Sequence, residues 1–227
     1  MSQPRRIERP GEVAFLFDVD NTLLDNDAAE RRYAQWIDEH LGDGASARFR
    51  RAYEAVRAER DYADYLGAVQ RVWNDEGGDP RWLVLGDFLL DFPFADYVFD
   101  GAFDALRAAG KRGAAWIVSD GDVVMQPRKI RRAGLWEAVQ GRVLIFVHKE
   151  NALHEIERRC QAQRYVMVDD KIRVLDAVKR QWGDRVHTVF VRQGHYAFDP
   201  RQIRAHPPAD RAVEAIDRFA ALAETLS

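Results

Sequence analysis

The chain has 227 residues, of which 47% are hydrophobic and 31% are charged. This composition is typical of a globular protein and excludes a disordered chain, and the length suits one domain or a core with a small inserted domain. The 34 basic and 37 acidic side chains give a formal net charge of -3, which offers no overall attraction for nucleic acid. The single cysteine, Cys160, excludes an intramolecular disulfide and a cysteine-based metal cluster.

The N-terminal segment has basic residues but no long apolar stretch, because Asp18 interrupts its only short apolar run. We therefore expect no signal peptide. No apolar run elsewhere approaches the ~20 residues that a membrane-spanning helix needs. These features predict a soluble, cytoplasmic protein that contacts neither membranes nor nucleic acid.

Five short runs rich in Val, Ile and Phe have the length of strands. They cover residues 13–19, 114–118, 143–147, 165–168 and 186–191. Each run is continuously apolar, which indicates a strand buried on both faces. Apolar residues at helical spacing lie between the later runs, and a last helix is expected near residues 210–226. This alternation predicts an α/β fold with a mainly parallel sheet and helices on both faces.

Residues 27–92 interrupt this alternation with apolar and aromatic side chains at helical spacing throughout. Glycines and prolines break the pattern at residues 42–44 and 77–80, and Pro93 closes it. The sequence therefore predicts an all-helical insert. We expect residues 1–24 and 96–227 to form a discontinuous α/β core domain and residues 25–95 to form a separate helical domain.

Two carboxylates stand at the end of the first predicted strand. Asp18 ends the apolar run, Asp20 follows two positions later, and Thr22 begins a turn. Residues i and i+2 of an extended chain project to the same side, so both carboxylates can meet one ligand. The alternative is that these polar residues only form a turn and cap a helix.

Polar side chains also follow three later strands. Ser119 comes after the second strand, Lys149 after the third, and the pair Asp169 and Asp170 after the fourth. The carboxyl ends of parallel strands are where ligands bind in open α/β sheets. The combination suits a phosphate group and a divalent metal ion.

The sequence resembles the haloacid dehalogenase-like (HAD) superfamily, in its phosphatase branch. The resemblance rests on four features in chain order: a strand followed by Asp18-Val-Asp20-Asn-Thr22-Leu, a strand followed by Ser119, the isolated Lys149, and the acidic pair. The resemblance covers roughly residues 12–24 and 96–195. It implies a Rossmann-like three-layer parallel sheet core with an inserted all-helical cap domain.

The resemblance also implies roles for these residues. Asp18 is expected to attack phosphorus and form an aspartyl phosphate, and Asp20 to protonate the leaving oxygen and then deprotonate the resolving water. Mg²⁺ is the expected cofactor, held by Asp18, by the Asp20 backbone carbonyl, and by Asp169 or Asp170. The phosphoryl oxygens are expected to be held by Thr22, with backbone N–H groups near it, and by Ser119 and Lys149.

Asp20 favours phosphate ester hydrolysis over carbon–halogen cleavage, because a halide leaves without a proton whereas an alkoxide needs one. The dehalogenases of this superfamily lack an acid at that position. Two alternatives stay open: a phosphotransferase or phosphomutase on the same scaffold, and a non-catalytic HAD-fold binding protein.

Some assignments stay open within the site. Lys149 is followed by Glu150 instead of the proline common in relatives, so Lys171 or the remoter Lys129 is an alternative phosphate ligand. A solvated charge at a helix end is the simpler interpretation of those two lysines. The segment 120–122 either lines the site or forms a capping turn.

A helical cap fits between Asp20 and Ser119, whereas only one helix and one strand fit between Ser119 and Lys149. A cap over the site favours a small phosphorylated metabolite as substrate. The cap's aromatic side chains are expected to form its core. Four arginines of the insert can meet an anionic substrate, although solvated arginines are the simpler interpretation: Arg31, Arg32, Arg57 and Arg60. The segment 192–196 can reach the edge of the site, although a structural role is the simpler interpretation of His195.

Overall fold

The computed structural model of the protein describes residues 11–226. Its centre is one six-stranded sheet in the order β3-β2-β1-β4-β5-β6, and every neighbouring pair of strands is parallel. The strands are β1 (Gly11–Phe17), β2 (Ala114–Asp120), β3 (Val143–Phe146), β4 (Ala162–Asp169), β5 (Val186–Val191) and β6 (Arg211–Val213). The predicted Rossmann-like α/β fold is confirmed.

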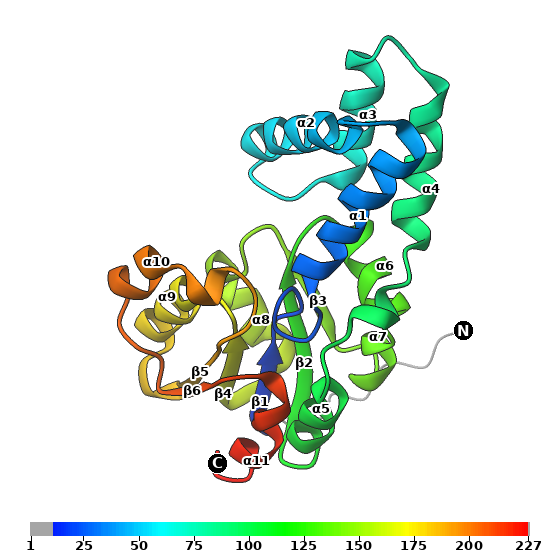
Figure 1. Cartoon of the computed structure of the whole chain (residues 1–227). Coiled ribbons are helices and arrows are strands. Elements are labelled where there is room, and N and C mark those ends of the chain that lie inside the picture. The colour runs from blue at the N-terminus through cyan, green and yellow to red at the C-terminus, as the bar shows by residue number, and fades with distance from the viewer. Residues whose placement is uncertain (1–10, 227) are drawn as a thin grey trace, which may run out of the picture.

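Helices cover both faces of the sheet (Figure 1). Along β1, Phe15 and Phe17 belong to one hydrophobic cluster and Ala14 and Leu16 to another, because successive side chains of a strand point to opposite faces. The first face packs against α5 (Ala102–Gly110), α6 (Met125–Arg132), α7 (Leu135–Ala138) and α11 (Phe219–Ala223). The second face packs against α8 (Leu153–Cys160) and α9 (Ile172–Trp182), with α10 (Pro200–Ala205) beside α9.

Four helices occupy the predicted insert. They are α1 (Asn26–Leu41), α2 (Ala45–Arg60), α3 (Tyr65–Asp75) and α4 (Leu83–Asp91), and they stand beyond the end of β1 in Figure 1. We call them the helical segment. The chain enters and leaves it through two paired stretches, since the Asp25 N–H donates to the Tyr97 carbonyl over 2.8 Å and the Phe99 N–H donates to the Leu23 carbonyl over 3.0 Å.

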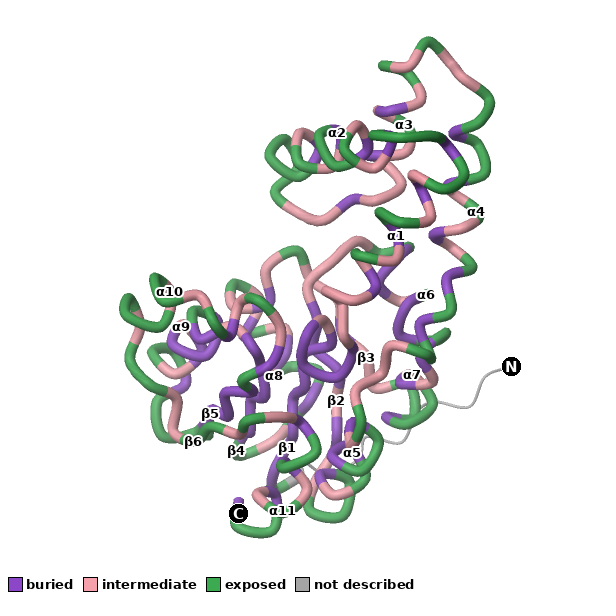
Figure 2. Tube along the Cα trace, in the orientation of Figure 1, coloured by how far each residue is buried: buried purple, intermediate pink, exposed green. Residues whose placement is uncertain are grey.

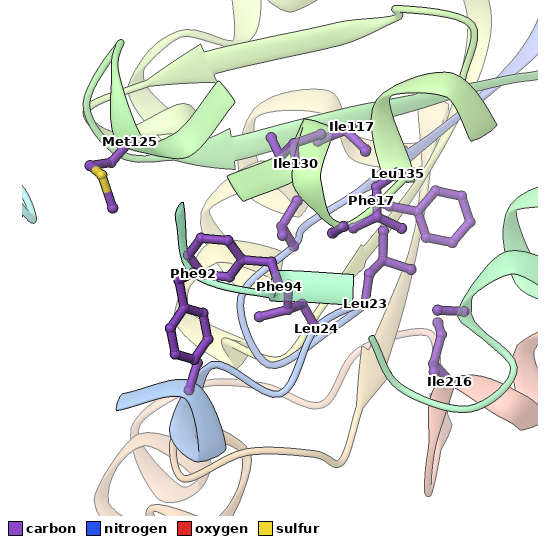
Figure 3. Close-up of a cluster of buried hydrophobic side chains, with 14 of the residues drawn as sticks. Phe17, Leu23, Leu24, Phe92, Phe94, Ile117, Met125, Ile130, Leu135 and Ile216 are labelled. Atoms are coloured by element: carbon purple, nitrogen blue, oxygen red, sulfur yellow. The ribbon is translucent and has the colours of Figure 1, made fainter. Parts of the chain in front are cut away.

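The helical segment shares its hydrophobic cluster with the sheet. Tyr33 and Phe92 pack edge to face with ring centroids 4.6 Å apart, and both belong to the cluster that contains Phe17. Figure 3 shows Phe92 and Phe94 in this cluster with residues of the core. The aromatic side chains of the segment thus form core, as expected, while the division into two domains stays a prediction.

The predicted last helix at residues 210–226 is wrong over most of its length. Residues 211–213 form β6, a 3-10 turn covers Ile216–Arg218, and only Phe219–Ala223 is α-helical. The strand forms because the Asp210 carboxylate accepts hydrogen bonds from the Thr188 N–H and from the Lys179 ammonium, both over 2.9 Å, which sets β6 beside β5. The apolar residues still pack on the sheet, where the Phe219 ring lies 5.1 Å from that of Phe17.

Among the helices of residues 11–226, none combines the length and the apolar character that a membrane crossing requires.

Candidate active site

The polar residues predicted at the strand ends meet at one edge of the sheet. Asp18 follows β1, Ser119 lies near the end of β2, Lys149 begins a short turn after β3, and Asp169 ends β4. These four side chains, like the Asp170 that follows, are at most 1% exposed. Figure 2 shows the buried strands and the loops that follow them at this edge. Buried polar groups need partners, so their contacts reveal how the site is organised.

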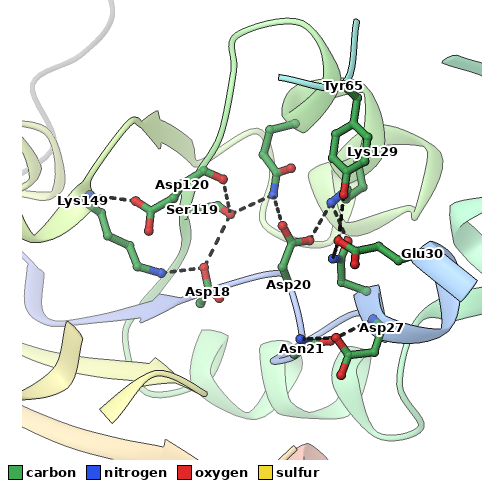
Figure 4. Close-up of polar contacts among 12 residues, drawn as sticks. Asp18, Asp20, Asn21, Asp27, Glu30, Tyr65, Ser119, Asp120, Lys129 and Lys149 are labelled. Atoms are coloured by element: carbon green, nitrogen blue, oxygen red, sulfur yellow. Dashed lines mark hydrogen bonds and ion pairs between the residues drawn. The ribbon is translucent and has the colours of Figure 1, made fainter. Parts of the chain in front are cut away.

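Lys149 is the centre of this cluster. Its ammonium lies 2.5 Å from Asp18 Oδ1 and 2.6 Å from Asp169 Oδ2, and Figure 4 shows the contact with Asp18. The Lys149 N–H donates to Asp120 Oδ1 over 2.7 Å, which anchors the backbone at this point. Lys149 thus connects the ends of β1, β3 and β4.

The charges of the cluster set the protonation of its members. Burial alone would raise the pKa of Asp18, but the ammonium groups of Lys149 and Lys171 lower it below its ordinary value. Burial would lower the pKa of Lys149, but the carboxylates of Asp169 and Asp18 raise it well above its ordinary value. Asp18 is therefore a carboxylate and Lys149 an ammonium at neutral pH.

Three carboxylates fit a divalent metal ion. Asp18, Asp169 and Asp170 offer one oxygen each within 4.8 Å of one another. Asp18 Oδ2 and both oxygens of Asp170 are buried and have no hydrogen-bond partner among residues 11–226. Burial raises the pKa of Asp170 well above its ordinary value and that of Asp169 to about 6. Mg²⁺ prefers oxygen ligands, so this group of carboxylate oxygens suits a Mg²⁺ ion.

The two members of the acidic pair differ in their contacts. Asp169 contacts the Lys149 ammonium and accepts a hydrogen bond from the Lys171 N–H over 2.8 Å. Asp170 makes neither contact. Asp170 is therefore the one with oxygens available to a metal ion, and Asp169 holds Lys149 in place.

Asp20 has a separate set of partners. Lys129 donates to Asp20 Oδ1 over 2.7 Å, and Gln126 donates to Asp20 Oδ2 over 3.2 Å. The Gln126 amide also donates to the Ser119 hydroxyl over 2.9 Å, while the contact from that hydroxyl to Asp18 Oδ1 is long, at 3.5 Å. In Figure 4 the Asp20 carboxylate points towards Lys129 and away from Lys149. The side chain of Asp20 is thus held outside the carboxylate trio.

Helix α6 supplies two residues whose importance the sequence did not reveal. The expectation that Lys129 is a solvated charge is wrong, because its side chain is 5% exposed and pairs with Asp20. Gln126 was not singled out, although it is buried at 4% exposure. Their spacing of three on a helix that follows Ser119 was the available signal, because residues i and i+3 share a helix face.

Thr22 lies in the turn that follows Asp18, and its role as a phosphate ligand stays a prediction. Its hydroxyl is buried and has no hydrogen-bond partner in the described part of the chain. The Thr22 N–H donates to the Val19 carbonyl over 3.1 Å within the turn, and phosphate binding by the N–H groups near Thr22 stays a prediction. Asn21, beside it, adopts a left-handed conformation with φ 61°, which asparagine tolerates better than most residues.

A second hydrogen-bonded cluster holds this turn against the loop after β5. Asp27 accepts from the Asn21 amide over 2.9 Å and from the His195 N–H over 2.8 Å, and its carboxylate lies 2.7 Å from His195 Nδ1. Gly194 faces the same turn, and a Cβ there would lie 2.3 Å from the Asn21 Cβ. His195 therefore has a structural partner in Asp27, and it also lines the cavity described below.

The remaining residues with two predicted roles either stabilise the local structure or line the cavity. Asp122 Oδ1 accepts hydrogen bonds from the N–H groups of Val124 and Met125, both over 2.8 Å, which is the predicted capping turn. Asp120 and Asp122 also line the cavity described below. Lys171 is a lining residue as well, with its ammonium 5.2 Å from the centroid of the Tyr196 ring.

A cavity of about 770 Å³ separates the sheet edge from the helical segment. Asp20 and Lys129 line it from the core, and Tyr33, Tyr65 and Arg57 line it from the helical segment. Tyr196 lines it from the core as well, and its proximity raises the pKa of Arg57. A volume of this size suits a small molecule.

Comparison with known proteins agrees with this geometry. Residues 13–180 match the model of the haloacid dehalogenase-like hydrolase family. The chain is similar to a haloacid dehalogenase-like hydrolase of Burkholderia xenovorans LB400, with 52% identity, a TM-score of 0.87, and 92% of this chain and 97% of that chain covered.

Two more distant structures share the fold at 14% identity. One is the L-2-haloacid dehalogenase of Xanthobacter autotrophicus, with a TM-score of 0.63. The other is a β-phosphoglucomutase homologue of Thermotoga maritima, with a TM-score of 0.61. Each comparison covers 94% of this chain and 99% of the other chain. No curated protein sequence matches significantly. The family match across most of the chain and the identity to the Burkholderia protein show that this chain belongs to the haloacid dehalogenase-like hydrolases.

Proposed function

We propose that the protein is a Mg²⁺-dependent phosphomonoester hydrolase that acts on a small phosphorylated metabolite through an aspartyl phosphate. The observation that carries this proposal is the arrangement of the two aspartates that follow β1. Asp18 is buried beside Lys149, whereas the Asp20 side chain is 25% exposed, lines the cavity and is held by Lys129. This arrangement supports a role for Asp18 as the nucleophile and for Asp20 as the group that exchanges a proton with the substrate.

The first step uses both aspartates. An oxygen of Asp18 bonds to phosphorus while the bond from phosphorus to the ester oxygen breaks, and protonated Asp20 gives its proton to that oxygen. The Lys149 ammonium beside Asp18 offsets negative charge on the phosphoryl oxygens, and the Ser119 hydroxyl at the end of β2 is a donor to them. Lys171 faces the cavity and is a further cation for the phosphoryl oxygens.

The second step restores the enzyme. A water molecule attacks phosphorus, its proton passes to the Asp20 carboxylate, and the bond between phosphorus and Asp18 breaks to release phosphate. Gln126 and Lys129 donate hydrogen bonds to the Asp20 carboxylate and so orient it for this proton exchange. Positioning and electrostatics of this kind supply most of the catalysis in phosphoryl transfer.

The metal ion has a defined set of candidate ligands. Asp18 and Asp170 have buried oxygens without partners, and the backbone carbonyl of Asp20 is the third expected ligand. When bound, Mg²⁺ neutralises charge on the phosphoryl oxygens and orients the group for attack. Asp169 is placed to act through Lys149 instead.

The direct test is phosphate release from p-nitrophenyl phosphate and from a panel of small phosphate esters, with Mg²⁺ and with a chelator present. The test compares the wild-type protein with Asp18→Asn and with Asp87→Asn, whose side chain is exposed on α4. We expect metal-dependent release that falls at least ~10³-fold in Asp18→Asn and is kept in Asp87→Asn. Release that survives the loss of Asp18 would overturn its role as nucleophile.

The same panel separates the alternatives. Isomerised sugar phosphate in place of free phosphate would indicate a phosphomutase. No phosphate release from any ester of the panel, with Mg²⁺ present, would favour the non-catalytic binding protein.

A further inference from the structure

The helical segment gives the cavity a wall of tyrosines. Tyr33 from α1, Tyr53 from α2 and Tyr65 from α3 all line it. The ring centroids of Tyr33 and Tyr65 are 5.8 Å apart, and those of Tyr53 and Tyr65 are 4.7 Å apart. Three helices thus bring their rings together as one aromatic surface.

One carboxylate lies against this surface. Glu30 lines the cavity, and its Oε1 accepts a hydrogen bond from the Tyr65 hydroxyl over 2.8 Å and another from the Asn26 amide over 3.0 Å. Both donors are neutral. Within residues 11–226, no cationic side chain pairs with Glu30. Among the described residues, Glu30 is therefore a partly buried carboxylate at the cavity wall that has neutral donors but no ion-pair partner.

The cations nearest this carboxylate do not pair with it among residues 11–226. The Lys129 ammonium donates to Asp20 and, over 2.9 Å, to the side-chain oxygen of Asn26. Arg57 lines the same cavity, and no ion pair joins it to Glu30 in the described part of the chain. The Glu30 carboxylate is thus available to a cationic ligand.

Glu30 and Asp20 lie at two ends of one hydrogen-bonded chain. It runs from Asp20 through Lys129 and Asn26 to Glu30, and in Figure 4 the Glu30 carboxylate lies below the ends of the Tyr65 and Lys129 side chains. Asp20 faces the ester oxygen in the proposed reaction. The aromatic wall therefore lies on the leaving-group side of the cavity.

We propose that Glu30, with Tyr33, Tyr53 and Tyr65, forms a subsite for an alkylammonium group on the substrate's leaving group, so that the substrates are phosphate monoesters of amino alcohols. This inference rests on the proposed phosphatase function. Aromatic rings attract a cation through their negative faces, and the attraction grows when water is excluded. A carboxylate adds a charge-assisted hydrogen bond or ion pair to the same cation.

The first experiment compares two esters that differ only at one end, phosphoethanolamine and 2-hydroxyethyl phosphate. For the wild-type protein we expect kcat/KM to be at least about tenfold higher for the ammonium ester. In Glu30→Gln, which keeps an acceptor for Tyr65, this ratio should fall to about one. Glu39→Gln, at an exposed position of the same helix that does not line the cavity, should keep the ratio.

Equal kcat/KM for the two esters in the wild-type protein would overturn the subsite, as would a ratio unchanged in Glu30→Gln. Hydrolysis of p-nitrophenyl phosphate by the same preparations shows whether the protein is a phosphatase. Failure of the subsite proposal is thereby distinguished from failure of the phosphatase proposal. Thermal unfolding of Glu30→Gln shows whether the variant is folded.

The second experiment needs no turnover. Choline and its neutral carbon analogue 3,3-dimethylbutan-1-ol are titrated by calorimetry into the wild-type protein, Glu30→Gln and Tyr65→Phe. We expect choline to bind at least about tenfold more tightly than the analogue, and Glu30→Gln to remove the difference. Equal binding of the two molecules would overturn the subsite whether or not the protein is a phosphatase.

Discussion

The ammonium of Lys129 lies 2.7 Å from Asp20 Oδ1, although 109 positions separate the two residues in the chain. Both side chains line the cavity, and the lysine is the more buried of the two, with 5% of its side chain exposed against 25% for Asp20. The pair directs the Asp20 carboxylate away from the carboxylate trio beside Lys149. It thereby separates Asp20, the proposed proton donor, from the residues that we propose hold the phosphoryl group and the metal ion.

Replacing Lys129 tests this separation. Lys129→Met should lower kcat/KM for esters with poor leaving groups about 10- to 100-fold, because the Asp20 carboxylate loses its orientation. The variant should also lose about 1–3 kcal/mol of unfolding free energy, since Asp20 is left without its charged partner. Steady-state kinetics and urea unfolding measure the two effects. Lys111→Met, at an exposed position, is the control; equal losses in both variants would remove Lys129 from the site.

Replacing Asp20 itself tests proton transfer. Asp20→Asn should reduce the hydrolysis of alkyl phosphates far more than that of activated aryl phosphates, because an aryl oxide leaves without a proton. We expect the losses to differ by about 10²-fold or more. The measurement is kcat/KM over a series of esters with leaving groups of increasing pKa. A uniform loss across the series would contradict the role of Asp20 as the acid.

The close approach of Gly194 to Asn21 predicts a loss of both stability and activity. A Cβ at position 194 would lie 2.3 Å from the Asn21 Cβ, and Gly194 has φ of 67°. Gly194→Ala should therefore cost more than about 1 kcal/mol and lower kcat by displacing the turn that follows Asp18.

Gly86→Ala is the matched control for Gly194. Gly86 lies within α4, and a Cβ there would meet no atom within 4 Å. That substitution should stabilise the protein by roughly 0.5–1 kcal/mol, because alanine favours a helix. Thermal unfolding and phosphate release are measured for both variants. A normal kcat in Gly194→Ala would show that the turn tolerates displacement.

Asp210 gives a dependence of stability on pH away from the active site. Burial opposes the shift, but hydrogen bonds from Thr188 and Lys179 lower the pKa of Asp210 below its ordinary value of 3.8. The folded state therefore holds the proton less tightly than the unfolded state. The stabilisation is fully present above pH 3.8 and is lost as the pH falls further, through the pKa of the folded state.

Urea unfolding of the wild-type protein and Asp210→Asn tests this dependence. The difference in unfolding free energy should be about 1–2 kcal/mol at pH 7 and should shrink below pH 4. Asp87→Asn, at an exposed position on α4, should show no such difference at either pH. A gap between the wild-type protein and Asp210→Asn that stays constant from pH 7 to pH 3 would contradict the assignment.

Local patterns were sufficient for the fold class and for most site residues. The apolar runs around Phe17 and Val118 mark strands because both faces of the sheet are covered, and the residues that follow such strands must lie at one edge. Asp18, Ser119, Lys149 and the acidic pair were found in this way, and the structure brings Asp18 within 2.5 Å of Lys149.

The last helix shows where a local pattern misled. Apolar residues at helical spacing between positions 210 and 226 predicted one helix, but the Asp210 carboxylate bonds to Thr188 in the neighbouring strand. That contact favours an extended chain at β6. The spacing of apolar residues indicates which side chains are buried, and here those side chains are buried on the sheet without forming one continuous helix.

The sequence by itself determined the α/β class, the helical insert and the polar residues at the strand ends, because each depends on neighbours within a few positions. Only the tertiary structure decided which partners those residues have. It placed Lys129 and Gln126 on Asp20, and within residues 11–226 it left the Asp170 carboxylate without a hydrogen-bond partner while Asp169 contacts Lys149. The physical reason is that desolvation and charge pairing act between side chains brought together by the sheet, at distances that no local pattern records.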